Sequence, residues 1–461
     1  MDLRGGPSSD PVDETRPRNL ILHTVGLLAG FNVISRTTSS FMVRSHLGTG
    51  PIFFGLLFCL LMTSAPIGAQ TAAPPLVLRG VNVVDPATGS IREDVSILVE
   101  DGLIARIAGR DAQAPAGVRE IALDGYWAVP GLLDAHSHMN TLDAAKRALD
   151  SGVTTVRTAG VDGFADVGIR DAVRAGRLPG PDILATGVYV TPEIGNGGLA
   201  DSRLYRFLDD SIDSEEELRT LVRVNAERGV DWIKTRATER AGTWNTDPRE
   251  QVYTEAELRA VVEEAERHGL SVAAHAHGEE GIVAAVNAGV KSIEHGTYAS
   301  DATLRLMLER GTWLVPTLSS VLSFGQPGDY ADPRIFLRGQ HLAPRRVEMV
   351  RTAYAMGVPI VVGVDTSYGP ESTARVSRAV TFMVEELDFE PMYALQAATS
   401  RSAELLGVAN RTGSMREGFE GDILVIDSNP LERVRALQDP LVIISNGHVV
   451  SNRLPFAKPG W

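Results

Sequence analysis

The chain of 461 residues is poor in several residue types, and each scarcity excludes a class of protein or site. Its single cysteine, Cys59, excludes an internal disulfide and any metal site built from several thiolates. There is no long run of lysine and arginine, and the formal net charge is −14, so nucleic acid is not an expected partner. The apolar run at residues 51–62 is shorter than the roughly 20 residues that a membrane-spanning helix needs.

The first 75 residues predict an extension that holds a signal peptide. Residues 51–62 would form its apolar core, Arg44 supplies a basic start, and small residues follow with cleavage near Ala69. We therefore expect export to the periplasm or out of the cell, with no stable membrane span after cleavage. A second apolar patch at residues 20–34 favours the alternative of an uncleaved membrane anchor.

Residues 131–408 alternate buried strands with amphipathic helices, such as those over 214–228 and 254–268. Eight strands of this kind are typical of a closed (β/α)8 barrel of the TIM type. The predicted strands are 127–138, 153–156, 182–186, 231–234, 271–275, 292–295, 313–317 and 359–365.

The two ends of the remaining chain read as short alternating strands, over residues 76–130 and 409–455. Asp101-Gly102 is a hairpin-type turn between two of them. Similar strand patterns on both sides of a different middle predict one small β-sandwich domain built from both chain ends. Two unrelated hairpins are the alternative.

The predicted carboxyl ends of the central strands carry half of the ten histidines of the chain. In a barrel these ends meet on the face that bears the active site. His136 and His138 lie on the same side of an extended strand, where two imidazoles can bind one metal ion. The other polar residues at such ends are Lys234, His275, His277, His295 and Asp365.

Lys234 follows Trp232 and Ile233 and should be buried. Burial favours the neutral amine, which can react with carbon dioxide to form a carbamate whose two oxygens can bridge two metal ions. Asp365 can bind a metal ion or act as a base. For His277, a substrate contact, support of a ligand and a place in a solvated loop all stay open.

Five motifs carry a resemblance to the binuclear metal-dependent amidohydrolases. They are PGLLDAHSH (130–138), VDWIK (230–234), AHAHG (274–278), SIEHGT (292–297) and GVD (363–365). The chain is most similar to the branch of imidazolonepropionase-like and Xaa-Pro dipeptidase (prolidase-type) members, which includes ochratoxin-degrading amidases. The resemblance covers roughly residues 76–455.

The resemblance implies a set of ligands for two divalent metal ions, and nitrogen and oxygen donors favour zinc. His136, His138 and Asp365 would bind the buried ion, and His275 and His295 the more exposed one. Carbamylated Lys234 would bridge both ions together with a hydroxide. That hydroxide would attack an amide carbonyl, and Asp365 would carry its proton to the leaving amine. A homo-oligomer is also implied.

The chain departs from the family at two places. The common Val-Arg-Asp-x-Gly motif reads Val-Arg-Thr-Ala-Gly at residues 156–160, and a tyrosine or Gly-Gly turn after the lysine is replaced by residues 235–238, Thr-Arg-Ala-Thr. A substrate carboxylate would need a cation, for which Arg236 is the candidate, although a plain surface charge is the alternative. Weaker candidates for substrate contacts are Tyr189, His277 and Tyr298, and walls are expected from residues 238–250 and 319–340, with Trp244 and Tyr330.

Three functions follow from these residues. The first is hydrolysis of amide bonds in dipeptides or N-acyl amino acids, which makes a small molecule or dipeptide the partner. The second is hydrolysis of a cyclic amide, a lactone or a carbamate on the same scaffold. The third is a metal-binding scaffold without catalysis, which a missing ligand or base would favour, and none is missing.

Overall fold

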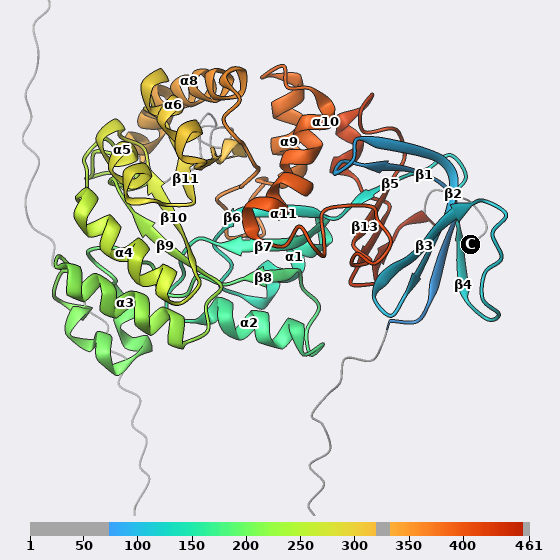
Figure 1. Ribbon diagram of the computed structural model, residues 1–461, viewed down its shortest axis with the longest axis horizontal. Coiled ribbons are helices and arrows are strands. Elements are labelled where there is room, and N and C mark those ends of the chain that lie inside the picture. The colour runs from blue at the N-terminus through green and yellow to red at the C-terminus, as the bar shows by residue number, and fades with distance from the viewer. Residues whose placement is uncertain (1–72, 320–331, 455–461) are drawn as a thin grey trace, which may run out of the picture. The chain divides into compact units, whose positions relative to one another are not determined.

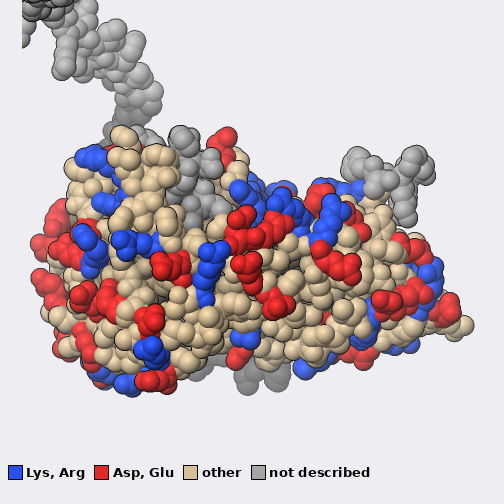
Figure 2. Space-filling view, turned by 90° about the horizontal axis from the view of Figure 1, so that it is seen from above, with Lys and Arg blue, Asp and Glu red and all other residues tan. Residues whose placement is uncertain are grey.

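The computed structural model describes residues 73–319 and 332–454. The predicted signal peptide and Tyr330 lie outside the described residues. Within the described ranges, no helix combines the length and the apolar character needed to cross a membrane. On the face seen in Figure 2, Lys and Arg side chains are interspersed with those of Asp and Glu.

The middle of the chain forms an α/β fold with two parallel sheets. One sheet holds β6 (Leu132–Ser137), β7 (Val153–Thr158) and β8 (Asp182–Leu184), and the other holds β9 (Trp232–Arg236), β10 (Ser271–Ala276), β11 (Ser292–His295) and β12 (Trp313–Val315). All pairs within both sheets are parallel. The predicted eighth strand, 359–365, is not assigned as a strand, but isolated parallel bridges join Ile360 to Leu314 and Thr366 to Ser137.

Helices follow the strands and cover them (Figure 1). Both helices that the sequence analysis singled out are present, and each begins with a capping box in which Ser214 or Thr254 pairs with a glutamate three residues on. The α-helices are α1 (Leu142–Asp150), α2 (Ala165–Arg174), α3 (Glu215–Glu227), α4 (Glu255–Arg267), α5 (Glu279–Ala288), α6 (Asp301–Arg310), α8 (Pro333–Met356), α9 (Val376–Glu385), α10 (Pro391–Ala397) and α11 (Ser400–Leu406). Short 3-10 helices are η1 (Gly195–Ala200), η2 (Ser202–Leu208) and η3 (Val434–Gln438).

The predicted opening strand is divided at Gly131. Residues before it form β5 (Trp127–Pro130), which belongs to a different sheet from β6. A Cβ atom at Gly131 would lie 2.1 Å from Oγ1 of Thr154, so only glycine fits against β7 here. The amide of Gly131 also donates to the carbonyl of Asp422, which turns the chain from one sheet to the other.

Both ends of the chain contribute to one eight-stranded sheet. Its strands are β1 (Leu76–Asp85), β2 (Ser90–Glu100), β3 (Leu103–Gly109), β4 (Arg119–Ala122), β5, β13 (Ile423–Ile426), β14 (Val442–Ser445) and β15 (His448–Asn452). The two halves meet where β13 runs antiparallel to β5, seen as red beside cyan in Figure 1. We call this the terminal sheet. Asp101 and Gly102 both have positive φ, 51° and 80°, in the predicted turn between β2 and β3.

Strand β13 is buried on both faces of the terminal sheet. Leu424 and Ile426 pack into the same apolar cluster as the central helices and strands. Ile423 and Val425 point the other way, into a second cluster with β1, β2 and β14. The terminal sheet is therefore packed against the α/β region that bears the candidate site.

Candidate metal centre

Among the described residues, two groups of side chains that could hold a metal ion lie where the central strands end. The first group is His136, His138 and Asp365, and the second group is His275, His277 and His295. Within each group, one ligand atom of each residue lies within 4.8 Å of the others. The structure thus brings together the residues that the sequence analysis assigned to each ion, and it adds His277 to the second group.

The hydrogen bonds of the first group leave lone pairs facing one another. Nδ1 of His136 lies 2.5 Å from Oε2 of Glu294, and Nδ1 of His138 lies 3.0 Å from the carbonyl oxygen of Gly160. A carboxylate and a carbonyl only accept, so each neutral ring carries its proton on Nδ1 and a lone pair on Nε2. These two Nε2 atoms lie 3.4 Å and 3.1 Å from Oδ1 of Asp365. A single proton could join only one of these two nitrogen atoms to Oδ1 of Asp365. A cation could accept lone pairs from the two nitrogen atoms and the oxygen together.

The second group is built around His295. Its Nε2 lies 2.9 Å from Nδ1 of His275, whose own Nε2 faces a backbone carbonyl at 3.2 Å. Nδ1 of His295 lies 2.7 Å from the hydroxyl of Thr317, and Nδ1 of His277 lies 2.8 Å from that of Thr297. Burial holds the pKa of all three imidazoles well below its usual range, which keeps them neutral and able to bind a cation.

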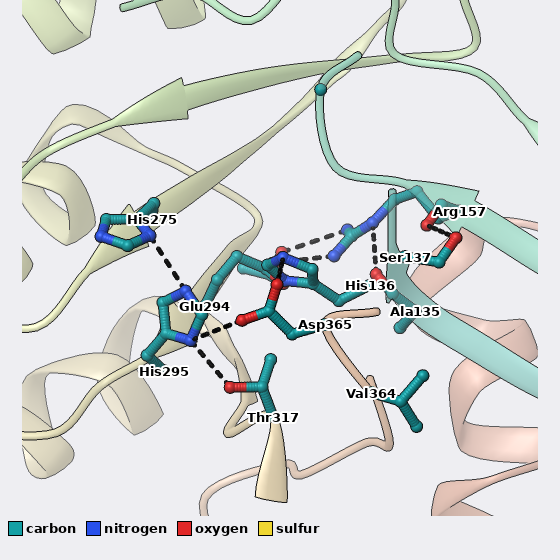
Figure 3. A network of polar contacts seen from close by, with 12 residues as sticks. Ala135, His136, Ser137, Arg157, His275, Glu294, His295, Thr317, Val364 and Asp365 are labelled. Carbon is teal, nitrogen blue, oxygen red and sulfur yellow. Dashed lines mark hydrogen bonds and ion pairs between the residues drawn. The ribbon is translucent and has the colours of Figure 1, made fainter. Parts of the chain in front are cut away.

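The two groups meet at Asp365 and Lys234. Oδ2 of Asp365 lies 4.0 Å from Nδ1 of His295, while its Oδ1 faces the first group (Figure 3). Nζ of Lys234 is buried and has no hydrogen-bond partner among the residues that the structure describes. Burial lowers the pKa of this amine to about 8, which raises the fraction of the neutral form that the sequence predicts. A buried amine without a partner is costly, by about 1–3 kcal/mol, and it fits a site that another group completes.

The buried ion pair of Arg157 and Glu294 supports the first group. Nη2 of Arg157 donates to Oε1 of Glu294 at 2.7 Å, and its Nε donates to the carbonyl of Ala135 at 2.8 Å (Figure 3). Burial alone would raise the pKa of Glu294, but Arg157 and Lys234 hold it well below its usual range. The carboxylate is therefore ionised and fixes the proton of His136. Glu294 was not among the residues predicted from the sequence, where its signal is an acidic residue inside the apolar strand that ends at His295.

Three neighbouring strand ends turn through the left-handed region of φ. The residues are His295, Thr317 and Asp365, with φ of 75°, 50° and 53°. Non-glycine residues in sparsely populated backbone conformations cost about 1–3 kcal/mol each and are characteristic of functional sites. At Gly363, a Cβ atom would lie 2.6 Å from Cβ of His136, so glycine is required for Asp365 to approach the first group.

A cavity of about 480 Å³ opens above both groups. Tyr189 and His277 line it, as expected for residues in contact with substrate. Arg240 and Arg346 also line it, and the sequence analysis identified neither. Among the described residues, the lining does not include Tyr298 or Arg236.

Arg236 is buried and does not line the cavity. Its side chain is only 2% exposed, and its Nη2 lies 3.3 Å from Oε2 of Glu193 and 3.4 Å from Oε1 of Glu239. Trp244 is half exposed, with the guanidinium of Arg334 stacked 3.8 Å from its ring centroid. The charge of Arg236 is thus already balanced by two carboxylates.

The departure from the family at Thr158 is compensated by a residue of α2. The Thr158 hydroxyl donates to Oδ2 of Asp166 at 2.6 Å, and the same oxygen accepts from the amides of Thr186 and Gly187. A carboxylate is therefore still present at the end of β7, supplied from eight residues further along the chain.

The chemistry of the two groups fits two divalent cations, since the lone pairs of neutral imidazoles and of one carboxylate converge beside a buried amine that has no hydrogen-bond partner among the described residues. The sequence matches the amidohydrolase family over residues 127–450. It is 27% identical over 434 residues to an ochratoxinase of Aspergillus niger, which covers 85% of this chain and 89% of that protein.

Two solved structures are also similar. A Xaa-Pro dipeptidase with methionine bound in its active site is 27% identical, with a TM-score of 0.73, over 81% of this chain and 99% of the other. A prolidase complexed with N-methylphosphonate-L-proline is 26% identical, with a TM-score of 0.71, over 82% and 100%. These findings confirm the resemblance stated from the motifs. The chain therefore belongs to the amidohydrolase family, and it is a hydrolase that acts on carbon–nitrogen bonds.

Proposed function

We propose that the protein is a binuclear metal-dependent hydrolase that cleaves the amide bond of dipeptides or N-acyl amino acids. The observation that carries this proposal is the convergence of both ligand groups on one carboxylate. Oδ1 of Asp365 lies 3.1 Å from Nε2 of His138, and its Oδ2 lies 4.0 Å from Nδ1 of His295. A carboxylate placed between two cation sites is positioned to accept a proton from a water molecule that binds between them.

The fold that accompanies this function is a closed (β/α)8 barrel beside a β-sandwich. Closure is supported by isolated parallel bridges at both gaps between the two sheets, from Val190 to Thr235 and through Ile360 and Thr366. The sandwich is supported by strand β13, which is buried on both faces.

Zinc is the proposed metal, because the donors are nitrogen and oxygen atoms. His136, His138 and Asp365 would hold one ion, His275 and His295 the other, and carbamylated Lys234 both. The unpartnered Nζ of Lys234 supports the carbamate, since a neutral buried amine is the form that reacts with carbon dioxide. When bound, the two ions would lower the pKa of a water molecule and polarise the scissile carbonyl.

The side chains of the site account for the proton transfers. Burial by itself would raise the pKa of Asp365, but His136 and His138, when they carry a proton on Nε2, hold it well below its usual range, so the group is an ionised acceptor. Its carboxylate takes a proton from water as the water oxygen bonds to the carbonyl carbon. The same proton then passes to the amine nitrogen as the C–N bond breaks.

Tyr189 is the proposed donor to the substrate. Its hydroxyl is buried and has no hydrogen-bond partner within the described ranges. Burial raises the pKa of this phenol, so it keeps its proton at neutral pH. A substrate carbonyl or carboxylate in the cavity would satisfy the O–H group.

The substrate class is supported by the relatives. One is a Xaa-Pro dipeptidase that holds methionine in its active site, and another is a prolidase that binds N-methylphosphonate-L-proline. An amino acid in the first and a proline derivative in the second both carry a carboxylate beside an amine or a blocked amine. The cavity of about 480 Å³ has the size of a small-molecule site.

The test is hydrolysis by the zinc-loaded full chain. The panel holds Xaa-Pro dipeptides, other dipeptides and N-acetyl amino acids, with a lactam and a lactone beside them. Asp365→Asn should lower kcat by about 100- to 10,000-fold, the usual contribution of a positioned acid–base group. Asp388→Asn is the matched control, because Asp388 is an exposed aspartate that also has positive φ, 58°.

Each outcome of the panel has a consequence. Turnover of acyclic amides that Asp365→Asn abolishes supports the proposal. Turnover of the lactam or lactone alone moves the function to cyclic substrates. No turnover by protein that holds two zinc ions per chain would refute the amidase function.

A further inference from the structure

Residues 239–250 form a loop whose tip is one wall of the cavity. Arg240, Ala241, Gly242 and Thr243 all line the cavity above the metal centre. The base of the loop is closed by an antiparallel bridge between Thr238 and Gln251. The amide of Glu239 also donates to the carbonyl of Glu250 at 2.9 Å.

The tip of this loop is held by one arginine from α8. Nη1 of Arg338 donates to the carbonyls of Ala241 and Thr243 at 2.9 Å and 2.7 Å. Its Nη2 donates to those of Trp244 and Thr246 at 3.3 Å and 2.6 Å. A guanidinium has five N–H donors in a rigid fork, and here both terminal nitrogens are occupied by four carbonyls of one short segment. These four hydrogen bonds tie the tip of the loop to α8.

Arg240 is the cation that this loop presents to the cavity. Among the described residues, three lysine and arginine side chains line the cavity: Lys234, Arg240 and Arg346. Lys234 is buried at the metal centre, and Arg346 is 1% exposed and donates to the hydroxyls of Thr297 and Thr317. Arg240 is exposed, and no hydrogen bond or ion pair joins its guanidinium to a residue that the structure describes.

We propose that Arg240 binds the carboxylate of the substrate and that Arg338 is the positioning residue that holds Arg240 in place. The inference rests on the proposed function, because it names the part of the substrate that an amidase for dipeptides or N-acyl amino acids would recognise. Arg240 takes the role that the sequence analysis gave to Arg236, whose charge is balanced by Glu193 and Glu239.

The physical reason for two arginines is the cost of ordering a loop. A guanidinium forms paired hydrogen bonds with a carboxylate only when its orientation is fixed. If the loop were free, binding of substrate would have to order it. The free energy spent on ordering the loop would lower the affinity for substrate. Loss of Arg338 should therefore weaken binding without changing the groups that carry out the reaction.

The first experiment compares N-acetyl-L-leucine with N-acetyl-L-leucinamide, which lacks the carboxylate. Binding to zinc-loaded Asp365→Asn protein is measured by calorimetry, with and without Arg240→Met as a second substitution. Loss of one charge-assisted pair should weaken binding of the carboxylate about 10- to 100-fold and change that of the amide by less than about threefold. An equal change for both ligands would overturn the assignment of Arg240.

The second experiment concerns Arg338. In otherwise native protein, Arg338→Met should raise KM for a carboxylate-bearing substrate about 3- to 10-fold, the cost of ordering a few side chains and a loop, with kcat nearly unchanged. Trypsin should also cut faster after Arg249, inside the loop. Arg351→Met is the matched control, since Arg351 lies on the same helix and donates to the carbonyl of Glu386. Equal cutting and KM in the Arg338→Met and Arg351→Met proteins would refute the positioning role.

The two hypotheses fail in different ways. If the wild-type protein hydrolyses no amide but still binds N-acetyl-L-leucine through Arg240, the proposed function fails and the carboxylate site stands. If amides are hydrolysed equally well with and without a carboxylate, and Arg240→Met changes neither, the proposed function stands and the carboxylate site fails.

Discussion

The two histidine groups are held by different kinds of partner. In the first group, His136 and His138 face a carboxylate and a backbone carbonyl, both of which only accept hydrogen bonds. In the second group, His277 and His295 face the hydroxyls of Thr297 and Thr317, which both donate and accept. The contacts of the first group thus fix the proton of each ring. In the second group, the carbonyl that faces His275 sets the tautomers of His275 and His295 through their mutual contact, whereas the hydroxyl that faces His277 can adapt to either tautomer.

One site thus combines a rigid half, the first group, with an adaptable half, the second group. The rigid half is supported by the buried pair of Arg157 and Glu294, and its ring tautomers are decided before any ion arrives. In the adaptable half, the hydroxyls of Thr297 and Thr317 can reverse the direction of their hydrogen bonds when the charge of the site changes. We expect the first group to retain its ion more tightly and the second to respond more to substrate and pH.

The largest effect should come from breaking the support of the rigid half. Glu294→Gln leaves the guanidinium of Arg157 buried without its carboxylate, and loss of one partner of a buried ion pair costs about 3–5 kcal/mol. Unfolding in urea should show this loss, and metal analysis should show one ion fewer per chain. Glu263→Gln, which removes an exposed partner of Arg219, should cost less than about 1 kcal/mol. Retention of both ions by Glu294→Gln would contradict the role of Glu294.

A smaller effect is expected in the adaptable half. Thr317→Val keeps the shape of the side chain but removes the hydroxyl that meets His295, and loss of such a partner typically weakens metal binding about 10- to 100-fold. Competition with a chelator measures the affinity of the weaker site. Thr297→Val removes the corresponding partner of His277, so an equal loss would make His277 a ligand, and no loss would make it a substrate contact. Unchanged affinity in both variants would remove the distinction between the groups.

The last effect concerns a buried carboxylate that, among the described residues, has no guanidinium partner of the kind that Glu294 has. Burial raises the pKa of Asp422, in the terminal sheet, to about 7. Its folded pKa is higher than its unfolded one, so the folded state keeps a proton that the unfolded state releases, and stability should fall as pH rises from about 4 to about 7. The slope should not exceed about 1.4 kcal/mol per pH unit for one proton. Asp422→Asn should remove that slope from urea unfolding measured at several pH values, and an unaltered slope would exclude Asp422 as its source.

Much of the metal centre could be predicted from the sequence because strands impose a simple geometry. His136 and His138 share a side because they are two residues apart, and Lys234 is buried because Trp232 and Ile233 precede it. The carboxyl ends of parallel strands then bring distant residues together without further information. These are local rules, and they hold here.

The remaining features depend on residues far apart in the chain. Spacing puts Arg236 on the same side of its strand as Lys234, but Glu193 and Glu239 approach from loops and take up its charge. The apolar run before His136 shows no break, and only the close approach of Thr154 requires the turn at Gly131. The hydrogen bonds of Arg338 to a loop almost a hundred residues earlier have no local signal.

The pairing of β13 with β5 has a consequence for how the protein is made. Ile423 pairs with Pro130, so strand β5 leaves the ribosome about 290 residues before its partner. At about 5–20 residues per second, translation between them takes on the order of 15–60 s. During that time one edge of the terminal sheet has no neighbour and can pair with another chain. Slow expression, which keeps few unfinished chains present at one time, should therefore raise the yield of folded protein. Protection of this edge by a chaperone should have the same effect.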